Sequence, residues 1–87
     1  MKIVDVLLSG RANAVPLDVL CSVTGIDGRT VRRMIAEERK AGAPILSDNA
    51  NGYFLPATDD ERARFVRSMK HRAHEILRAA EAVERGK

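Results

Sequence analysis

Three arginines fall on one face of a predicted helix in the middle of the chain. At ~100° per residue, the stretch "GRTVRRMIAEERKAG" places Arg29, Arg32 and Arg33 on a common side with Lys40. The apolar residues occupy the opposite side: Val31, Met34 and Ile35. If that apolar side is buried, the arginines project together, and each planar guanidinium can hold a guanine edge or a phosphate. The alternative is a solvated face of the kind that any surface helix carries.

No other group of residues indicates catalysis. The chain has no Gly-rich phosphate loop, no Ser/His or Cys/His arrangement and no cluster with metal-ligand spacing. His71 and His74 lie one helical turn apart and could share a metal, but a structural site normally needs four ligands, so a solvated basic face is favoured. Cys21 is interpreted as a small buried apolar residue. We therefore expect a protein that is not an enzyme and has no cofactor, metal or small-molecule ligand.

The composition of the chain limits the classes of protein to which it can belong. The chain has 87 residues, enough for one small domain, with a formal net charge of +3 that alone does not imply nucleic-acid binding. The distribution is more informative, because residues 62–74 hold five Arg or Lys and no acid. One cysteine excludes an intramolecular disulfide, and no stretch approaches the ~18 apolar residues that cross a bilayer. These features predict a soluble cytoplasmic protein with no membrane contact.

The pattern of apolar residues and turn signals predicts a mainly α fold with a small β-hairpin. A first short helix should carry Ile3, Val4, Leu7 and Leu8 and stop at Gly10. A second should span about 16–23, begin at Pro16 and bury Leu17, Leu20 and Val23. The third should span 28–41, and a last helix should span about 59–85. Residues 11–15 should form a loop, in which a short strand near 14–16 could extend the hairpin to three strands.

Local signals define the joins between these elements. Gly25 suits a tight turn, Asp27 is a natural N-cap, and Gly42 ends the third helix. "DNANG" between two short apolar runs predicts the hairpin, with Tyr53 and Leu55 on one face and Phe54 on the other. Thr58 and Glu61 form a capping box for the last helix. The predicted organisation is a domain of residues 1–56 followed by a C-terminal helix, 57–87.

Helix, turn, helix and hairpin together resemble a known family. The segment "LDVLCSVTGIDGRTVRRMIAEERKAGAPILSDNANGYFL" is similar to winged helix-turn-helix domains of the biotin-repressor type, and more so to the small winged-helix proteins of phages and mobile elements. The resemblance covers about residues 16–55. It implies a double-stranded DNA-binding protein, such as a transcriptional regulator, with the helix 28–41 in the major groove. A replication or packaging assembly factor and a protein-docking winged helix remain as alternatives.

The resemblance also implies which residues contact DNA. The groove-facing residues would be Gly28, Arg29, Thr30, Arg32 and Arg33, and the hairpin tip would contribute Asn49 and Asn51. The chain departs from the family pattern at two places, because this tip has no Arg or Lys and Glu38 stands where Leu is expected. We expect Glu38 to be exposed at the edge of its helix. The alternative is a buried carboxylate paired with a cation such as Arg72.

The last helix is predicted to be too long for one domain to cover. A stripe with 3-4-3-4-3 spacing marks a heptad seam: Val66, Met69, Ala73, Ile76, Ala80 and Val83. Its ~27 residues make a rod of roughly 40 Å, against a body about 25–30 Å across. Phe65 should pack on its own domain, and the later part should be left in water. A homodimer through this seam is expected, and a helix folded back or frayed past Leu77 is the alternative.

Overall fold

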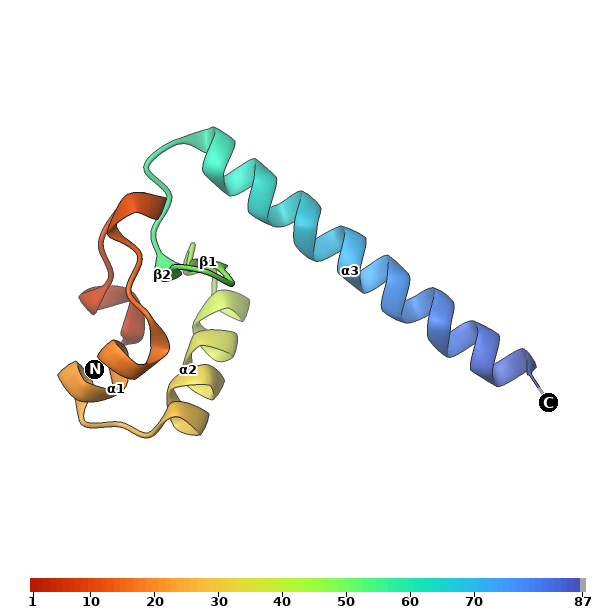
Figure 1. Ribbon diagram of the computed structural model, residues 1–87, viewed down its shortest axis with the longest axis horizontal. Helices are drawn as coiled ribbons and strands as arrows, with labels where there is room; N and C mark the ends of the chain where they lie inside the picture. Colours follow the sequence, from red (N-terminus) through yellow and green to blue (C-terminus); the bar gives the residue numbers. More distant parts are fainter. Residues whose placement is uncertain (87) are drawn as a thin grey trace.

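The computed structural model describes residues 1–86, so position 87, the end of the expected C-terminal segment, lies outside the described residues. A compact body carries a single long helix that runs away from it (Figure 1), giving extents of 48 × 30 × 25 Å. The elements follow in this order: 3-10 helices η1 (Ile3–Val6) and η2 (Arg11–Asn13), helices α1 (Leu17–Thr24) and α2 (Gly28–Lys40), strands β1 (Leu46–Asp48) and β2 (Gly52–Phe54), and helix α3 (Asp59–Arg85). The predicted mainly α fold with a hairpin and a long last helix is confirmed.

The core lies where η1, α1, α2 and the start of the hairpin meet. Its buried side chains come from four separate segments of the chain: Ile3, Leu7, Leu20, Val31, Ile35 and Ile45. Val31 and Ile35 lie one turn apart on α2, so burying them turns the opposite side of that helix outward. The core therefore sets the orientation of α2.

A glycine turn fixes the angle between α1 and α2. Gly25 has a φ of 73°, a left-handed conformation that favours glycine, and its N–H donates to the Cys21 carbonyl. Asp27 then caps α2 by accepting hydrogen bonds from the N–H and the hydroxyl of Thr30. Gly28 lies against α1, since a Cβ at this position would be 3.4 Å from Leu17 Cδ2. The expected turn and N-cap are confirmed.

The hairpin is antiparallel and pairs Leu46 with Phe54 and Asp48 with Gly52. Phe54 is buried on one face, while Tyr53 and Leu55 pack against the core on the other, which confirms the predicted alternation. The expected third strand near 14–16 is reduced to a single bridge, in which Val15 and Tyr53 exchange both backbone hydrogen bonds. The sheet has two strands, because the chain turns into α1 at Pro16 directly after this bridge.

The expected first α-helix is wrong in type and extent. Only Ile3–Val6 is helical, as one 3-10 turn. After it, the Leu8 carbonyl accepts from Leu55 N–H and Gly10 N–H donates to the Leu55 carbonyl, so this segment is held extended beside the hairpin. Leu8 is consequently 58% exposed, and Val23, expected to be buried by α1, is 67% exposed because it lies in the last turn of that helix.

Glu38 is placed differently from both sequence interpretations. It is half-buried, and its hydrogen-bond partners are not cations. Its two carboxylate oxygens accept from the backbone N–H groups of Ile3 and Val4, at 2.8 and 2.9 Å. These N–H groups open η1 and have no partner within that short helix. Glu38 therefore acts as a cap, supplied by α2, for the N-terminal 3-10 turn.

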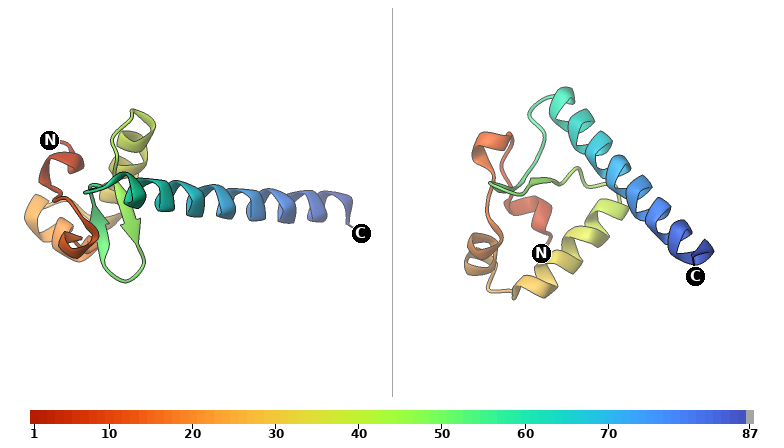
Figure 2. Two further views of the ribbon diagram at one scale, coloured as in Figure 1. Left: turned by 90° about the horizontal axis from the view of Figure 1, so that it is seen from above. Right: turned by 45° about the vertical axis from the view of Figure 1, so that its right-hand side comes forward.

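The long helix α3 has the predicted bounds and is attached to the body near its start. Thr58 Oγ1 accepts from Glu61 N–H, as in a capping box, but the Glu61 carboxylate turns to the N–H groups of Ala57 and Arg11. Phe65 packs on the body, where the guanidinium carbon of Arg39 lies 5.0 Å from its ring centre. The second half of the helix runs clear of the body in Figure 1, and no side chain of α3 is buried. Figure 2 shows the same helix from two further sides.

Candidate functional site

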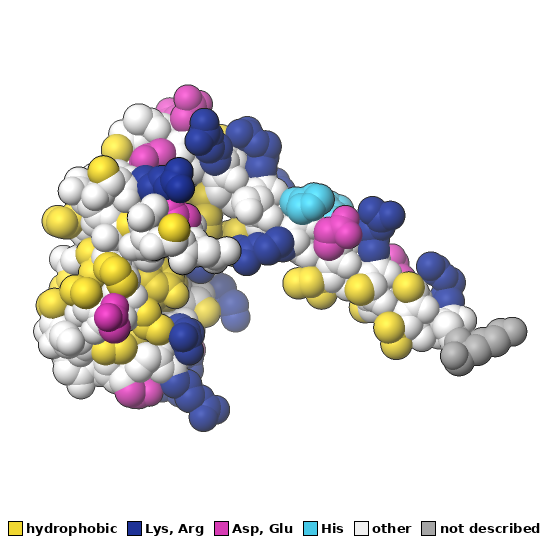
Figure 3. All heavy atoms as spheres, in the orientation of Figure 1, with side chains coloured by type: hydrophobic (Ala, Val, Ile, Leu, Met, Phe, Trp, Pro, Cys, Tyr) yellow, Lys and Arg dark blue, Asp and Glu magenta, His cyan; other side chains and the backbone are white. Residues whose placement is uncertain are grey.

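The outward face of α2 presents free arginines. Arg29, Arg32 and Arg33 are exposed, as are Ala36 and Lys40 on the same side, while Val31 and Ile35 on the opposite side are buried. No ion pair involving these arginines is found among residues 1–86. In Figure 3, Lys and Arg side chains line the side of the body that faces the open angle beneath α3. Three fork-shaped cations within about one helical turn can bind phosphates or base edges.

Two other residues expected at this face have structural contacts instead. Thr30 is committed to the cap, because both its N–H and its hydroxyl donate to Asp27. The hydrogen bond from the Thr30 hydroxyl holds the pKa of Asp27 below its ordinary value. Gly28 backs onto Leu17 and Cys21 of α1. Thr30 and Gly28 thus position the start of α2, and Arg29, Arg32 and Arg33 are the groups left free.

The hairpin tip is organised by one carboxylate. Asp48 accepts from the N–H groups of Ala50 and Asn51, from the Asn51 side-chain amide, and from Arg11 Nε. The Asn51 side chain is the main cause that lowers the pKa of Asp48, followed by the Asn51 N–H and Arg11. Of the two expected tip residues, Asn51 is therefore partly engaged within the turn. Asn49 is exposed, and its side chain makes no hydrogen bond within the described part of the chain.

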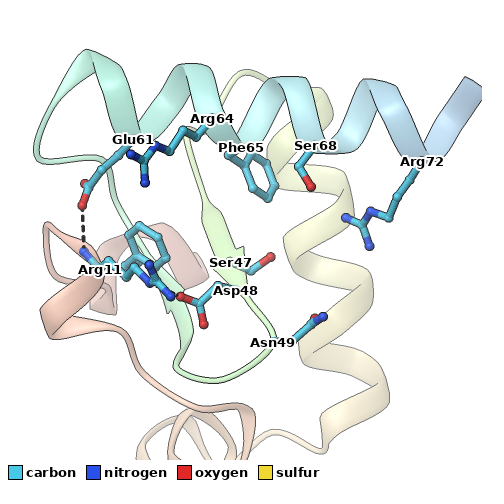
Figure 4. Close-up of a pocket in the computed structure, with 10 residues that line it drawn as sticks. Arg11, Ser47, Asp48, Asn49, Glu61, Arg64, Phe65, Ser68 and Arg72 are labelled. Carbon is cyan, nitrogen blue, oxygen red and sulfur yellow. Dashed lines mark hydrogen bonds and ion pairs between the residues drawn. The ribbon is translucent and has the colours of Figure 1, made fainter.

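A groove of about 620 Å³ lies between the hairpin and the first half of α3 (Figure 4). Its acids are occupied: Asp48 pairs with Arg11, and Glu61 accepts from two backbone N–H groups, first that of Ala57, which lower its pKa. Figure 4 shows Arg72 pointing from α3 back toward α2, while Arg64 lies at the other end of the groove. The lining residues are Arg11, Ser47, Asp48, Asn49, Phe54, Glu61, Arg64, Phe65, Ser68 and Arg72. This second basic surface was missed, although the acid-free run 62–74 was its signal in the sequence.

Arg39 was also missed as the residue that joins α2 to α3. Its Nε donates to the Ile45 carbonyl at 2.8 Å, a terminal nitrogen reaches Ser47 Oγ at 3.2 Å, and its plane covers Phe65. Burial is the main cause that lowers the pKa of this guanidinium, and the neighbouring Arg72 acts in the same direction. Arg39 is thus a structural cation, and its hydrogen bonds withdraw it from the free arginines of α2.

Neither a metal cluster nor a membrane span is found among the described residues. Within residues 1–86, no three His, Cys, Asp or Glu side chains come together in a way that could hold a metal ion. None of the described helices combines the length and the apolar character needed to cross a bilayer. Comparison with protein-family models, with curated proteins and with solved structures gave no match.

Proposed function

We propose that this protein is a winged helix-turn-helix that binds double-stranded DNA and acts as a transcriptional regulator. One observation carries the proposal: Arg29, Arg32 and Arg33 are exposed together on a helix whose opposite face is buried. Inserted in a major groove, such a helix can direct bidentate Arg forks to the O6 and N7 atoms of guanine. The role is that of a binding protein rather than an enzyme.

The order of elements supports the same proposal. Two helices joined by a glycine turn precede a hairpin, which in this interpretation is the wing. The hairpin tip has no cation, so its contribution would come from the amides of Asn49 and Asn51 rather than from charge. Arg64 and Arg72 in the neighbouring groove are cations that could neutralise phosphates beside the wing. A cytoplasmic location follows for a bacterial or phage-encoded regulator, because its DNA lies in that compartment.

Two other functions are distinguished by what the arginine face contacts. A replication or packaging assembly factor would use the same face on DNA, with little preference for sequence. A protein-docking winged helix would leave it unused for DNA. Exposed, closely spaced arginines favour the two DNA-binding functions, because phosphate contacts supply most of the affinity of such proteins.

Selection of bound sequences from random duplex DNA tests the proposal. A regulator should enrich one motif, and Arg29→Ala should relax the preference at a single base position, at a cost of ~1–3 kcal/mol. Retention of DNA without an enriched motif would favour an assembly factor. Failure to retain any duplex at low salt would contradict DNA binding altogether.

A further inference from the structure

The second half of α3 exposes an apolar stripe that the body does not cover. Ile76 is 70% exposed and Val83 is 80% exposed, and Leu77 beside them is also exposed. Figure 3 shows hydrophobic side chains in a row along one side of the helix, below its charged side chains. Most of the stability of a protein helix comes from packing its apolar face. An occupant for this stripe is therefore required.

The spacing of the stripe identifies the kind of occupant. The six seam residues alternate in steps of three and four, which is the pattern that packs against another helix of the same period. A second copy of α3 has that period. A closed twofold pair is also the commonest assembly of identical chains. The seam thus fits α3 of another copy.

We propose that α3 pairs with α3 of a second copy in the antiparallel direction. Because the 3-4-3-4-3 spacing reads the same from both ends, an antiparallel pair aligns every seam residue with another. Val66 lies opposite the partner's Val83, Met69 opposite the partner's Ala80, and Ala73 opposite the partner's Ile76. Each layer then holds either two medium-sized side chains or one large and one small, which gives even packing.

A parallel pair fits these residues less well. In that direction every seam residue meets its own copy, so Ala73 and Ala80 form two small layers while Met69 and Ile76 form two large ones. Alternately narrow and wide layers leave voids between helices held at constant separation, and voids are destabilising. The side-chain volumes therefore favour the antiparallel direction.

The charges on α3 favour the same direction. Residues 62–74 carry five Arg or Lys and no acid, whereas residues 75–85 carry three glutamates and two arginines. An antiparallel pair places the glutamate-containing end of each helix beside the basic end of the other. A parallel pair sets the two basic ends side by side, where like charges repel.

The antiparallel pair also fixes the distance between the two bodies. It brings position 65 of one helix level with position 84 of the other, so the two Phe65 attachments lie ~28 Å apart along the helix axis. This is close to the ~34 Å that separates half-sites one turn apart on DNA. The dimer itself does not depend on the proposed DNA binding. If both hold, the selected DNA motif should contain two inverted half-sites about one turn apart.

Disulfide cross-linking between single-cysteine variants tests the direction of pairing. In a Cys21→Ser background, Val66→Cys and Val83→Cys proteins of different mass are mixed and oxidised without DNA. The antiparallel pair predicts the mixed 66–83 dimer from the mixture and little dimer from either variant alone, because two copies of position 66 lie ~25 Å apart. Met69→Cys with Ala80→Cys repeats the test in the next layer. Dimers of 66 with 66, or of 83 with 83, in the unmixed samples would overturn the proposal.

Sedimentation tests the pairing without a cross-link. Ile76→Glu should raise the dissociation constant of the dimer at least about tenfold, because it puts a charge into an apolar layer. Ala82→Glu introduces the same side chain on a face of α3 away from the seam and should leave the dimer in place. Circular dichroism checks that both variants fold. A wild-type chain that remains monomeric at high micromolar concentration would also overturn the proposal.

Discussion

Glu38 has hydrogen-bond partners that could not be identified from the sequence. Its place on the apolar face of α2 was visible, and it indicated either an exposed edge or a buried ion pair. Its actual partners are the backbone N–H groups of Ile3 and Val4, 35 and 34 positions away. Backbone donors leave no trace in residue types, so no pattern could identify them. The sequence offered a charged side chain, Arg72, as a candidate partner, because residue types show side chains and not which backbone groups lie nearby.

Replacing Glu38 should therefore destabilise the fold, contrary to the expectation for an exposed edge. Glu38→Leu leaves two N–H groups of η1 without an acceptor, and hydrogen bonds to charged groups are worth about 1.5–3 kcal/mol each. We expect the free energy of unfolding to fall by at least about 2 kcal/mol in urea melts. Glu37→Leu is the matched control, because Glu37 is exposed, and should change it little. Equal stability of the two variants would show that the cap contributes nothing.

Asp48 should make the hairpin sensitive to acid. Its pKa in the folded protein is held below the ordinary value of 3.8, chiefly by the Asn51 amide. The stabilisation is therefore present above that ordinary value and is lost as the pH falls through the lower, folded-state pKa. Urea melts of wild type and Asp48→Asn should differ most near neutral pH and converge as the pH falls through that lower pKa. A stability difference that does not change with pH would contradict this account.

At the scale of elements, local chemistry was sufficient wherever caps and turns are made of neighbouring residues. Asp27 and Thr58 cap α2 and α3 as their spacing predicted, and Gly25 adopts the left-handed turn. The prediction of a first α-helix was wrong because backbone hydrogen bonds to Leu55, far along the chain, determine the conformation of residues 8–10. The apolar residues Leu7 and Leu8 suggested a helix, but pairing with the end of the hairpin holds them extended. Long-range backbone pairing overrode a local pattern.

Alanine substitutions at two glycines distinguish the cost of backbone strain from the cost of steric crowding. Gly42 and Gly52 have nearly equal positive φ angles, 104° and 106°. A Cβ at Gly42 would meet no atom within 4 Å, whereas a Cβ at Gly52 would collide with the Val15 carbonyl. Gly42→Ala should cost ~1–2 kcal/mol from strain alone. Gly52→Ala should cost clearly more and disrupt the bridge to Val15, as measured by denaturant melts. Equal costs would mean that the hairpin does not lie against Val15.

At the scale of the whole molecule, the length of the last helix and the spacing of its apolar residues could be used for prediction, whereas the shape of the surface could not be derived from the sequence. The mismatch between a rod of roughly 40 Å and a small body predicted an uncovered stripe, and the seam residues of α3 are exposed. The groove between the hairpin and α3 could not be predicted, because its shape depends on the position of α3, which is held by the contact between Arg39 and Phe65. The free arginines of α2 could be foreseen, since burial of Val31 and Ile35 dictates the opposite face. The roles of Thr30 and Gly28 could not, because they depend on the packing against α1.

Anisotropy titration of a labelled duplex measures whether the arginines of α2 bind DNA. Arg32→Ala/Arg33→Ala is compared with Arg78→Ala/Arg85→Ala, because both variants lower the formal net charge from +3 to +1. At two salt concentrations, we expect the α2 variant to weaken binding at least about tenfold and to reduce its salt dependence, and the distal variant to change both far less. Equal affinity of wild type and Arg32→Ala/Arg33→Ala would contradict the account.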